Sequence, residues 1–172
     1  MLFSTEGKAI RFNESLVRSM GRVVTGVRGI KLPEGHKVIS LIVVPPECED
    51  RYVLTATENG YGKRTHISEY PVKGRGGMGV VAIKTSKRNG SMVGACLLDE
   101  NSEIMLITDG GTIVRTRSSE VSVVGRNTQG VRLIRLTNDE KLVQIARVCE
   151  TENDEAQNVA PENGETPGEE DN

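Results

Sequence analysis

Short runs of apolar residues, separated by residues that form turns, follow one another through the first 149 positions of the chain. In the last third of this region, the run 103–108 ends at the turn sequence Asp-Gly-Gly (109–111), and the run 112–117 follows at the distance of a β-hairpin. A polar connection then leads to the runs 131–136 and 142–148. This pattern predicts four β-strands of five to eight residues and contains no convincing helix.

The same order of runs occurs twice more, earlier in the chain. The corresponding runs are 1–4, 8–12, 27–32 and 37–44 in the first part, and 52–57, 62–67, 80–85 and 91–98 in the second. Several of these runs are apolar at successive positions. Such a pattern is expected of a small sheet that is covered by a neighbouring sheet on each face.

A template of six residues accompanies each set of strands. It consists of Gly, Arg four positions later, Ser at eight, Gly-Arg at fourteen and fifteen, and Gly at nineteen. The copies are Gly7, Arg11, Ser15, Gly21, Arg22 and Gly26; Gly60, Arg64, Ser68, Gly74, Arg75 and Gly79; and Gly111, Arg115, Ser119, Gly125, Arg126 and Gly130. Their first glycines lie 53 and 51 residues apart, and a period near fifty residues is typical of blades or arrays.

The repeats predict an all-β, propeller-like fold of about three blades with four antiparallel strands each, at about 1–50, 51–102 and 103–149. Each repeat is expected to form one supersecondary unit that packs against its neighbours. We interpret the three repeated glycines as backbone positions that need a positive φ or a close approach of another chain segment. The repeated serine indicates a turn or a cap.

Charge divides the chain into two regions. The segment 150–172 holds nine acidic residues and no Lys or Arg, and its composition predicts a disordered tail. The body holds 22 Lys and Arg against 15 acidic residues, a net charge of +7. A basic body suggests a polyanionic partner. The acidic tail either competes with that partner for the basic surface or acts only as a solubilising end.

Three template positions are basic in every repeat. They are Arg11, Arg64 and Arg115 at the fourth position, Arg22, Arg75 and Arg126 at the fifteenth, and Lys31, Lys84 and Arg135 at the twenty-fourth. Phased cations can follow the phosphates of duplex DNA. Because no helix, zinc-finger spacing or aromatic platform is evident, contact with the DNA backbone is the expected mode. For the fourth-position arginines, the alternative is that they pair with acids such as Glu69 or Glu120 or cover apolar surface with their aliphatic stems.

Other functions find little support in the sequence. His36 and His66 have no partners at catalytic spacing, Asp99, Glu100 and Asp109 resemble solvated loop charges, and no metal-ligand pattern is present. Three cysteines without CxxC spacing favour reduced thiols in a cytoplasmic protein. Neither a signal peptide nor a membrane-spanning run is evident.

Three segments make the sequence recognisable: ENGYGKRT (58–65), EIMLITDGGTIVRTR (103–117) and VGRNTQGVRLIRL (124–136). They closely resemble the C-terminal domain of the bacterial DNA gyrase A protein, and the resemblance covers about residues 1–149. It implies a β-pinwheel whose basic rim wraps duplex DNA, so that the holoenzyme introduces negative supercoils. The family domain has about six blades, which makes this chain similar to its C-terminal half. The signature heptapeptide QRRGGKG is missing, and KGRGGMG (73–79) is a degenerate counterpart.

The resemblance implies further expectations. The chain should catalyse nothing alone and hold no cofactor, since ATP and Mg²⁺ act on other domains of the family. Expected partners are duplex DNA, the rest of the gyrase A protein and the gyrase B protein in a heterotetramer. Alternatives are the corresponding domain of topoisomerase IV, or a propeller scaffold that binds an acidic protein. The predicted DNA contacts are Lys8, Arg11, Arg22, Lys31, Lys63, Arg64, Lys73, Arg75, Lys84, Arg115, Arg117, Arg126, Arg132 and Arg135.

Overall fold

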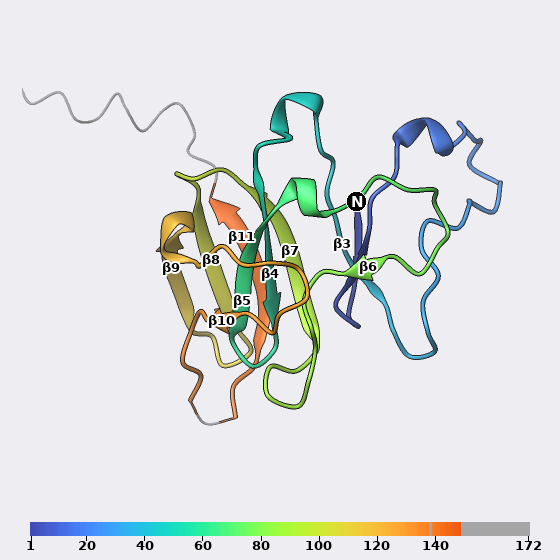
Figure 1. Ribbon diagram of the computed structural model, residues 1–172. Helices are drawn as coiled ribbons and strands as arrows, with labels where there is room; N and C mark the ends of the chain where they lie inside the picture. The colour runs from blue at the N-terminus through green and yellow to red at the C-terminus, as the bar shows by residue number, and fades with distance from the viewer. Residues whose placement is uncertain (138, 149–172) are drawn as a thin grey trace, which may run out of the picture.

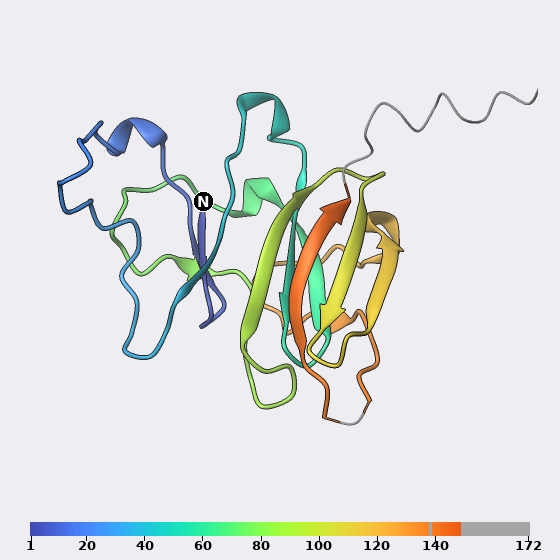
Figure 2. The same ribbon diagram turned by 180° about the vertical axis from the view of Figure 1, so that it is seen from behind.

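Three antiparallel sheets lie side by side and make up the body of the protein (Figure 1; Figure 2 shows the opposite side). The computed structural model describes residues 1–137 and 139–148. Within these residues there is no α-helix, and the four helical segments are single 3₁₀ turns: η1 (Glu14–Leu16), η2 (Pro46–Cys48), η3 (Ile67–Glu69) and η4 (Ser118–Glu120). The predicted all-β fold is confirmed.

The first and second sheets have four strands each, and the third has three. The first has the order β3 (Val38–Leu41), β1 (Leu2–Ser4), β2 (Lys8–Ile10) and β6 (Val80–Val81). The second has the order β10 (Val131–Arg132), β5 (Tyr61–His66), β4 (Tyr52–Thr57) and β7 (Met92–Leu98). The third has the order β11 (Leu142–Val148), β8 (Glu103–Thr108) and β9 (Ile113–Arg117).

The outer strand of each four-stranded sheet comes from the following repeat. β6 of the second repeat pairs with β2 of the first, with Ala9 opposite Val80, and β10 of the third repeat pairs with β5 of the second, with Gly62 opposite Val131. The expectation that each repeat supplies all four strands of its own blade is therefore wrong. The long Gly-Arg connection allows this exchange, because it carries the chain across to the preceding sheet before the outer strand begins.

The expected lengths of these outer strands are also wrong. The runs 80–85 and 131–136 contain strands of only two residues, and 27–32 contains no strand in the structure. Gly79 and Gly130 precede the two short strands with φ of +74° and +77°, and a Cβ on either glycine would collide with a carbonyl of the preceding sheet. The close approach of the chain depends on glycine here, whereas Gly26 shows no positive φ.

Two hydrophobic clusters fill the spaces between the sheets. One contains Phe3, Val53 and Tyr70, and the other contains Leu54 and Leu106. Val53 and Leu54 are neighbours on β4, and because successive side chains of a strand point to opposite faces, they belong to different clusters. The second sheet is therefore buried on both faces, as its continuous apolar runs predicted.

The predictions for the repeated glycines are confirmed in part, and the prediction for the repeated serines is confirmed. Gly7, Gly60 and Gly111 have φ between +78° and +85°, as predicted, whereas Gly21, Gly74 and Gly125 show no positive φ. The repeated serines lie in η1, η3 and η4, which confirms their assignment to turns.

Cys48 and Cys96 are free thiols, while Cys149 and the acidic tail lie outside the described residues. No helix in the described ranges is long and apolar enough to cross a membrane.

Candidate nucleic-acid interface

The repeated cations lie along the outer edges of the sheets or beside them. Strand β7 lies between β3 and β11 and contacts both, and these three strands form the inner side of the molecule. The outer strands β6 and β10 lie at the opposite edges of their sheets, and the loops 74–79 and 125–130 lead directly into them. This outer side, with its loops, is the rim of the molecule.

The fourth-position arginines of the first two repeats connect one repeat to the next. Arg64 is buried, and its Nε donates to the carbonyl of Val121 at 2.8 Å while its Nη1 lies 3.0 Å from Glu100. Arg11 makes the equivalent contacts, donating to the carbonyl of Tyr70 at 3.4 Å and to a Glu49 carboxylate. An arginine enclosed in this way stabilises the contact between one repeat and the next. The alternative of pairing with acids holds, although the acids are not the expected Glu69 and Glu120.

Arg115 has the same template position but a different environment. It is exposed and pairs with Glu103 of the adjacent strand β8. In the described part of the chain no following repeat supplies the carbonyl that Arg11 and Arg64 reach. The role of this column therefore depends on the neighbouring repeat.

The Gly-Arg arginines join the loops of successive repeats. Arg75 donates from Nη1 to the carbonyl of Arg28 at 3.1 Å, and Arg126 donates from Nη1 to the carbonyl of Val81 at 2.9 Å. Arg28 and Val81 hold the same template position in the first and second repeats. Arg22, by contrast, is exposed. These arginines hold the rim together while staying close to its surface.

The twenty-fourth position supplies the exposed cations of the rim. Lys31, Lys84 and Arg135 are exposed, and their side chains make no hydrogen bond or ion pair with the other described residues. Two of the backbones are fixed, since the amides of Lys31 and Lys84 donate at 2.8 Å to the carbonyls of Gly77 and Thr128 in the next Gly-Arg loop. We call each lysine, together with the loop it contacts, a rim site: Lys31 with 74–79, and Lys84 with 125–130.

The family model for the "DNA gyrase C-terminal domain, beta-propeller" matches residues 1–45, 51–95 and 102–149, one match for each repeat. The chain belongs to this family. It is 58% identical over 155 residues to the DNA gyrase A protein of Escherichia coli, and 55% identical over 150 residues to that of Pseudomonas aeruginosa. These alignments cover 90% and 87% of this chain but only 17% and 16% of the relatives, so the chain spans about a sixth of their length.

Two solved structures share the architecture of this family member. The DNA gyrase A C-terminal domain superposes with a TM-score of 0.74 at 32% identity, covering 86% of this chain and 50% of that one. The C-terminal domain of DNA topoisomerase IV gives 0.77 at 25% identity, covering 86% and 45%. The two folds are similarly close, and the sequence identity favours the gyrase branch.

Lys63 differs from its counterparts in the other two repeats of this chain. It takes a template position that is apolar in the other repeats, Ile10 and Val114, and it is fully buried. Its ammonium donates to the carbonyl of Gly125 at 2.5 Å and also to the carbonyl of Arg126. Burial lowers the pKa of Lys63 to about 8, with Glu69 opposing and Arg126 assisting the shift. Lys63 therefore fixes the 125–130 loop from inside, which argues against its expected contact with DNA.

A second cationic group on the rim includes a residue that the repeat pattern missed. The guanidinium groups of Arg88 and Arg132 lie 5.0 and 5.4 Å from the centre of the Tyr61 ring, and Arg132 donates to the Tyr61 hydroxyl at 2.9 Å. The hydrogen bonds from Arg132 and Arg88 hold the pKa of Tyr61 below its usual value. Arg88 belongs to no basic column, so alignment of the repeats could not have found it.

The remaining predicted contacts have mixed surroundings. Lys8 pairs with Glu6 at 2.9 Å, while Lys73 and Arg117 are exposed. Asp99 and Glu100 lie between β7 and β8 with side chains that are 38% and 57% exposed, as expected of solvated loop charges, and each also makes an ion pair: Asp99 with Arg147 at 2.9 Å and Glu100 with Arg64. No group of metal-ligating side chains occurs among residues 1–137 and 139–148.

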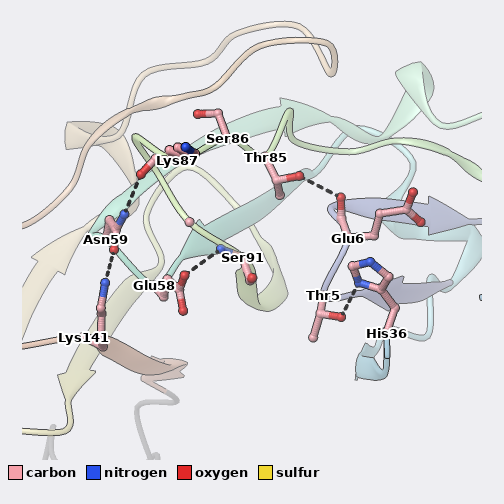
Figure 3. A pocket seen from close by; sticks show the side chains of 11 residues that line it. Thr5, Glu6, His36, Glu58, Asn59, Thr85, Ser86, Lys87, Ser91 and Lys141 are labelled. Carbon is pink, nitrogen blue, oxygen red and sulfur yellow. Dashed lines mark hydrogen bonds between the residues drawn. The ribbon is translucent and has the colours of Figure 1, made fainter. Parts of the chain in front are cut away.

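A shallow hollow of about 450 Å³ opens where turns of the three repeats meet (Figure 3). Its polar groups bind one another: Lys141 Nζ donates to Asn59 Oδ1 at 2.6 Å, Asn59 donates to the Lys87 carbonyl at 3.4 Å, and Ser91 donates its amide to Glu58 at 3.1 Å. His36 accepts or donates a hydrogen bond with Thr5 at 3.0 Å. This network joins the turns, and it presents neither a paired nucleophile and base nor a ligand cage.

Proposed function

We propose that this chain binds duplex DNA along its rim, through phosphates and without regard to sequence. The observation that carries the proposal is the pair of rim sites, in which the same cation stands beside the same loop in successive sheets. Lys31 and Lys84 are exposed and their backbones are anchored by the same 2.8 Å hydrogen bond. Cations at equivalent points of successive sheets can contact the phosphates of duplex DNA, which carries one negative charge per about 1.7 Å of its axis.

The geometry of the rim favours backbone contact over base readout. Its cations stand on loops and on strands of two residues, and the described residues contain no α-helix that could enter a major groove. Loop cations at successive sheets hold a duplex against the side of the molecule at several points. Binding at several points along a rim is the arrangement that wrapping of DNA requires.

Family membership supports a place for this segment in DNA gyrase. The gyrase A proteins of Escherichia coli and Pseudomonas aeruginosa contain the matching segment, so we propose that the chain serves as the DNA-wrapping part of such a protein. It would then act with the rest of the gyrase A protein and with a gyrase B protein in the supercoiling reaction. ATP and Mg²⁺ would then act on other parts of such a protein.

Titration of the full chain with duplex DNA over a series of salt concentrations tests this function. The double variant Lys31→Ala/Lys84→Ala should bind more weakly, and its plot of log affinity against log salt should be less steep by about 2, since each phosphate contact contributes about 0.9. Duplexes of unrelated sequence should bind equally. The matched control is Lys37→Ala/Lys87→Ala, which removes the same charge from two other exposed lysines.

The control separates a localised site from general charge. Equal losses in the two double variants would mean that net charge alone attracts DNA and would remove the rim sites from the proposal. An affinity for DNA that does not respond to salt would contradict phosphate contact itself. In that case a binding titration with an acidic protein would become the next experiment.

A further inference from the structure

Two arginines lie against one buried tyrosine on the rim of the second sheet. Tyr61 begins β5 and is only 6% exposed, while Arg88, from the turn before β7, and Arg132, from β10, are exposed. Their guanidinium carbons lie 5.0 and 5.4 Å from the centre of the Tyr61 ring, and Arg132 also donates to the Tyr61 hydroxyl at 2.9 Å. We call these three residues the Tyr61 cluster, because the ring holds both cations on one small patch.

The backbone of Arg88 is fixed beside this ring by two asparagine side chains. Asn59 donates to the carbonyl of Arg88 at 3.1 Å. Asn89 is fully buried, and its Nδ2 donates to the carbonyl of Lys84 at 2.9 Å and to a carbonyl of the 125–130 loop at 3.2 Å. The turn that carries Arg88 is therefore joined to both parts of the second rim site.

The charges of the Tyr61 cluster are not neutralised by an acid in the described chain. None of the ion pairs among residues 1–137 and 139–148 includes Arg88 or Arg132. Two cations at one ring repel each other, and the aromatic face and a hydroxyl oxygen compensate only part of that cost. Hydrogen bonds from Arg132 and Arg88 also lower the pKa of Tyr61, so this point of the surface favours negative charge.

The first rim site has no equivalent of this cluster. Lys8 takes the position of Tyr61 in the first sheet, and Val81 takes the position of Arg132 on the outer strand. No arginine occurs between positions 31 and 37, the segment that corresponds to the turn of the second repeat. The two rim sites therefore share their lysine and loop, but the second has two further cations.

We propose that the Tyr61 cluster binds a phosphate of duplex DNA beside Lys84, a contact that the first rim site lacks. The inference rests on the proposed DNA binding and adds Arg88 and Tyr61 to the groups that take part in it. A guanidinium group presents paired donors in a plane that match two oxygens of a phosphate. Tyr61 is a positioning residue, because its ring supports both guanidinium groups and its hydroxyl directs Arg132. Less side-chain freedom is then lost when DNA binds.

Titration of the full chain with duplex DNA over a salt series measures the contribution of the cluster. Arg88→Ala/Arg132→Ala should lower the affinity about tenfold, and its plot of log affinity against log salt should be less steep by about 0.9, the value for one phosphate. The control Lys37→Ala/Lys87→Ala removes the same charge. Lys87 precedes Arg88 on the same turn but lines the hollow of Figure 3, so the control should bind nearly as the wild type does.

Two further variants separate geometry from charge. Arg88→Lys keeps the charge but loses the planar donors, so it should recover only part of the affinity that Arg88→Ala loses. Tyr61→Phe keeps the ring but releases Arg132, so it should weaken binding less than the double variant does. Duplex DNA should also raise the pKa of Tyr61, because phosphate takes over the donors that lower it. The difference in ultraviolet absorbance between wild type and Tyr61→Phe during an alkaline titration measures this shift.

The rim-site variant Lys31→Ala/Lys84→Ala distinguishes the failure of the cluster from the failure of the proposed function. If this variant loses affinity while Arg88→Ala/Arg132→Ala binds as the wild type does, the cluster is overturned and DNA binding along the rim stands. A wild type that does not bind DNA would overturn both. Equal losses in Arg88→Ala/Arg132→Ala and the Lys37→Ala/Lys87→Ala control would reduce the cluster to general charge. Polyglutamate that binds through the same arginines as tightly as DNA would overturn the assignment to phosphate.

Discussion

The second and third sheets are built from the same template, yet residues at the same template position differ in burial and in their partners. In the second sheet Arg64 is buried and bound to Val121 and Glu100, while in the third sheet Arg115 is exposed and bound to Glu103 of its own sheet. The difference lies in the following repeat, which covers the second sheet and supplies β10 to it. A residue of this template acquires its role from the neighbour that covers it.

The two arginines give the largest expected contrast. Arg64→Ala should lower the free energy of unfolding by about 3–4 kcal/mol, because it leaves a buried carbonyl and part of a carboxylate without a donor. Arg115→Ala should cost less than about 0.5 kcal/mol, as is usual for an exposed ion pair. Urea denaturation of both variants measures the difference. Equal costs would mean that the following repeat does not determine the role of this arginine.

Gly60 and Gly111 have similar backbone conformations and test whether a following repeat covers the glycine. Gly60 and Gly111 have φ of +78° and +85°, so alanine is strained at both. A Cβ on Gly60 would also lie 2.7 Å from the carbonyl oxygen of Ile134, whereas a Cβ on Gly111 meets nothing within 4 Å. Gly60→Ala should therefore cost about 2–3 kcal/mol and Gly111→Ala about 1 kcal/mol. Thermal unfolding compares them, and a larger cost at Gly111 would contradict the open edge of the third sheet.

The buried Lys63 should make the stability of the second sheet depend on pH, and the third sheet has Val114 at the same template position. Since the pKa of Lys63 is lowered to about 8 in the folded chain, the unfolded chain binds more protons between about pH 8 and 10.5, and stability rises with pH over that range. The wild type should gain about 1 kcal/mol relative to Lys63→Met across this window, a value reduced for screening by nearby solvent. Val114→Met is the control in the third sheet. Parallel pH curves for the wild type and Lys63→Met would contradict the burial of this charge.

The Gly-Arg column gives the smallest contrast. Arg126→Ala removes a hydrogen bond to the Val81 carbonyl and should cost about 0.5–1 kcal/mol, whereas Arg22→Ala should leave stability nearly unchanged in a single chain. The comparison is made by denaturation of dilute protein. Equal costs for the two variants would mean that the hydrogen bond from Arg126 to the Val81 carbonyl contributes nothing to stability.

The sequence predicted the strands of each hairpin because local signals determine them. The runs 52–57 and 103–108 end at Gly60 and Gly111 turns, and the structure places β4 and β8 at those positions. The sheet to which an outer strand belongs could not be predicted in this way. Val131 follows its own repeat in the sequence, but its pairing with Gly62 depends on the path of the whole 125–130 loop.

The basic columns were visible in the sequence, but their division into structural and exposed cations was not. Arg64 and Lys84 both belong to columns that are basic in every repeat, and nothing local distinguishes their roles. What separates them is distance to a carbonyl of a neighbouring repeat, which only the packed fold determines. Lys63 carried a weak signal, since a lysine between the counterparts Ile10 and Val114 indicates a buried position with polar partners.

The exchange of outer strands gives the molecule a direction for local unfolding. If the third repeat opens, it withdraws β10 from the second sheet, and the edge of β5 loses its cover in the same event. If the first repeat opens, the second sheet keeps all four of its strands. Fraying should therefore spread from later repeats toward earlier ones, and amide hydrogens of β5 should exchange with solvent together with those of the third repeat. Each repeat protects the one before it, so the cooperative unit is longer than the repeat itself.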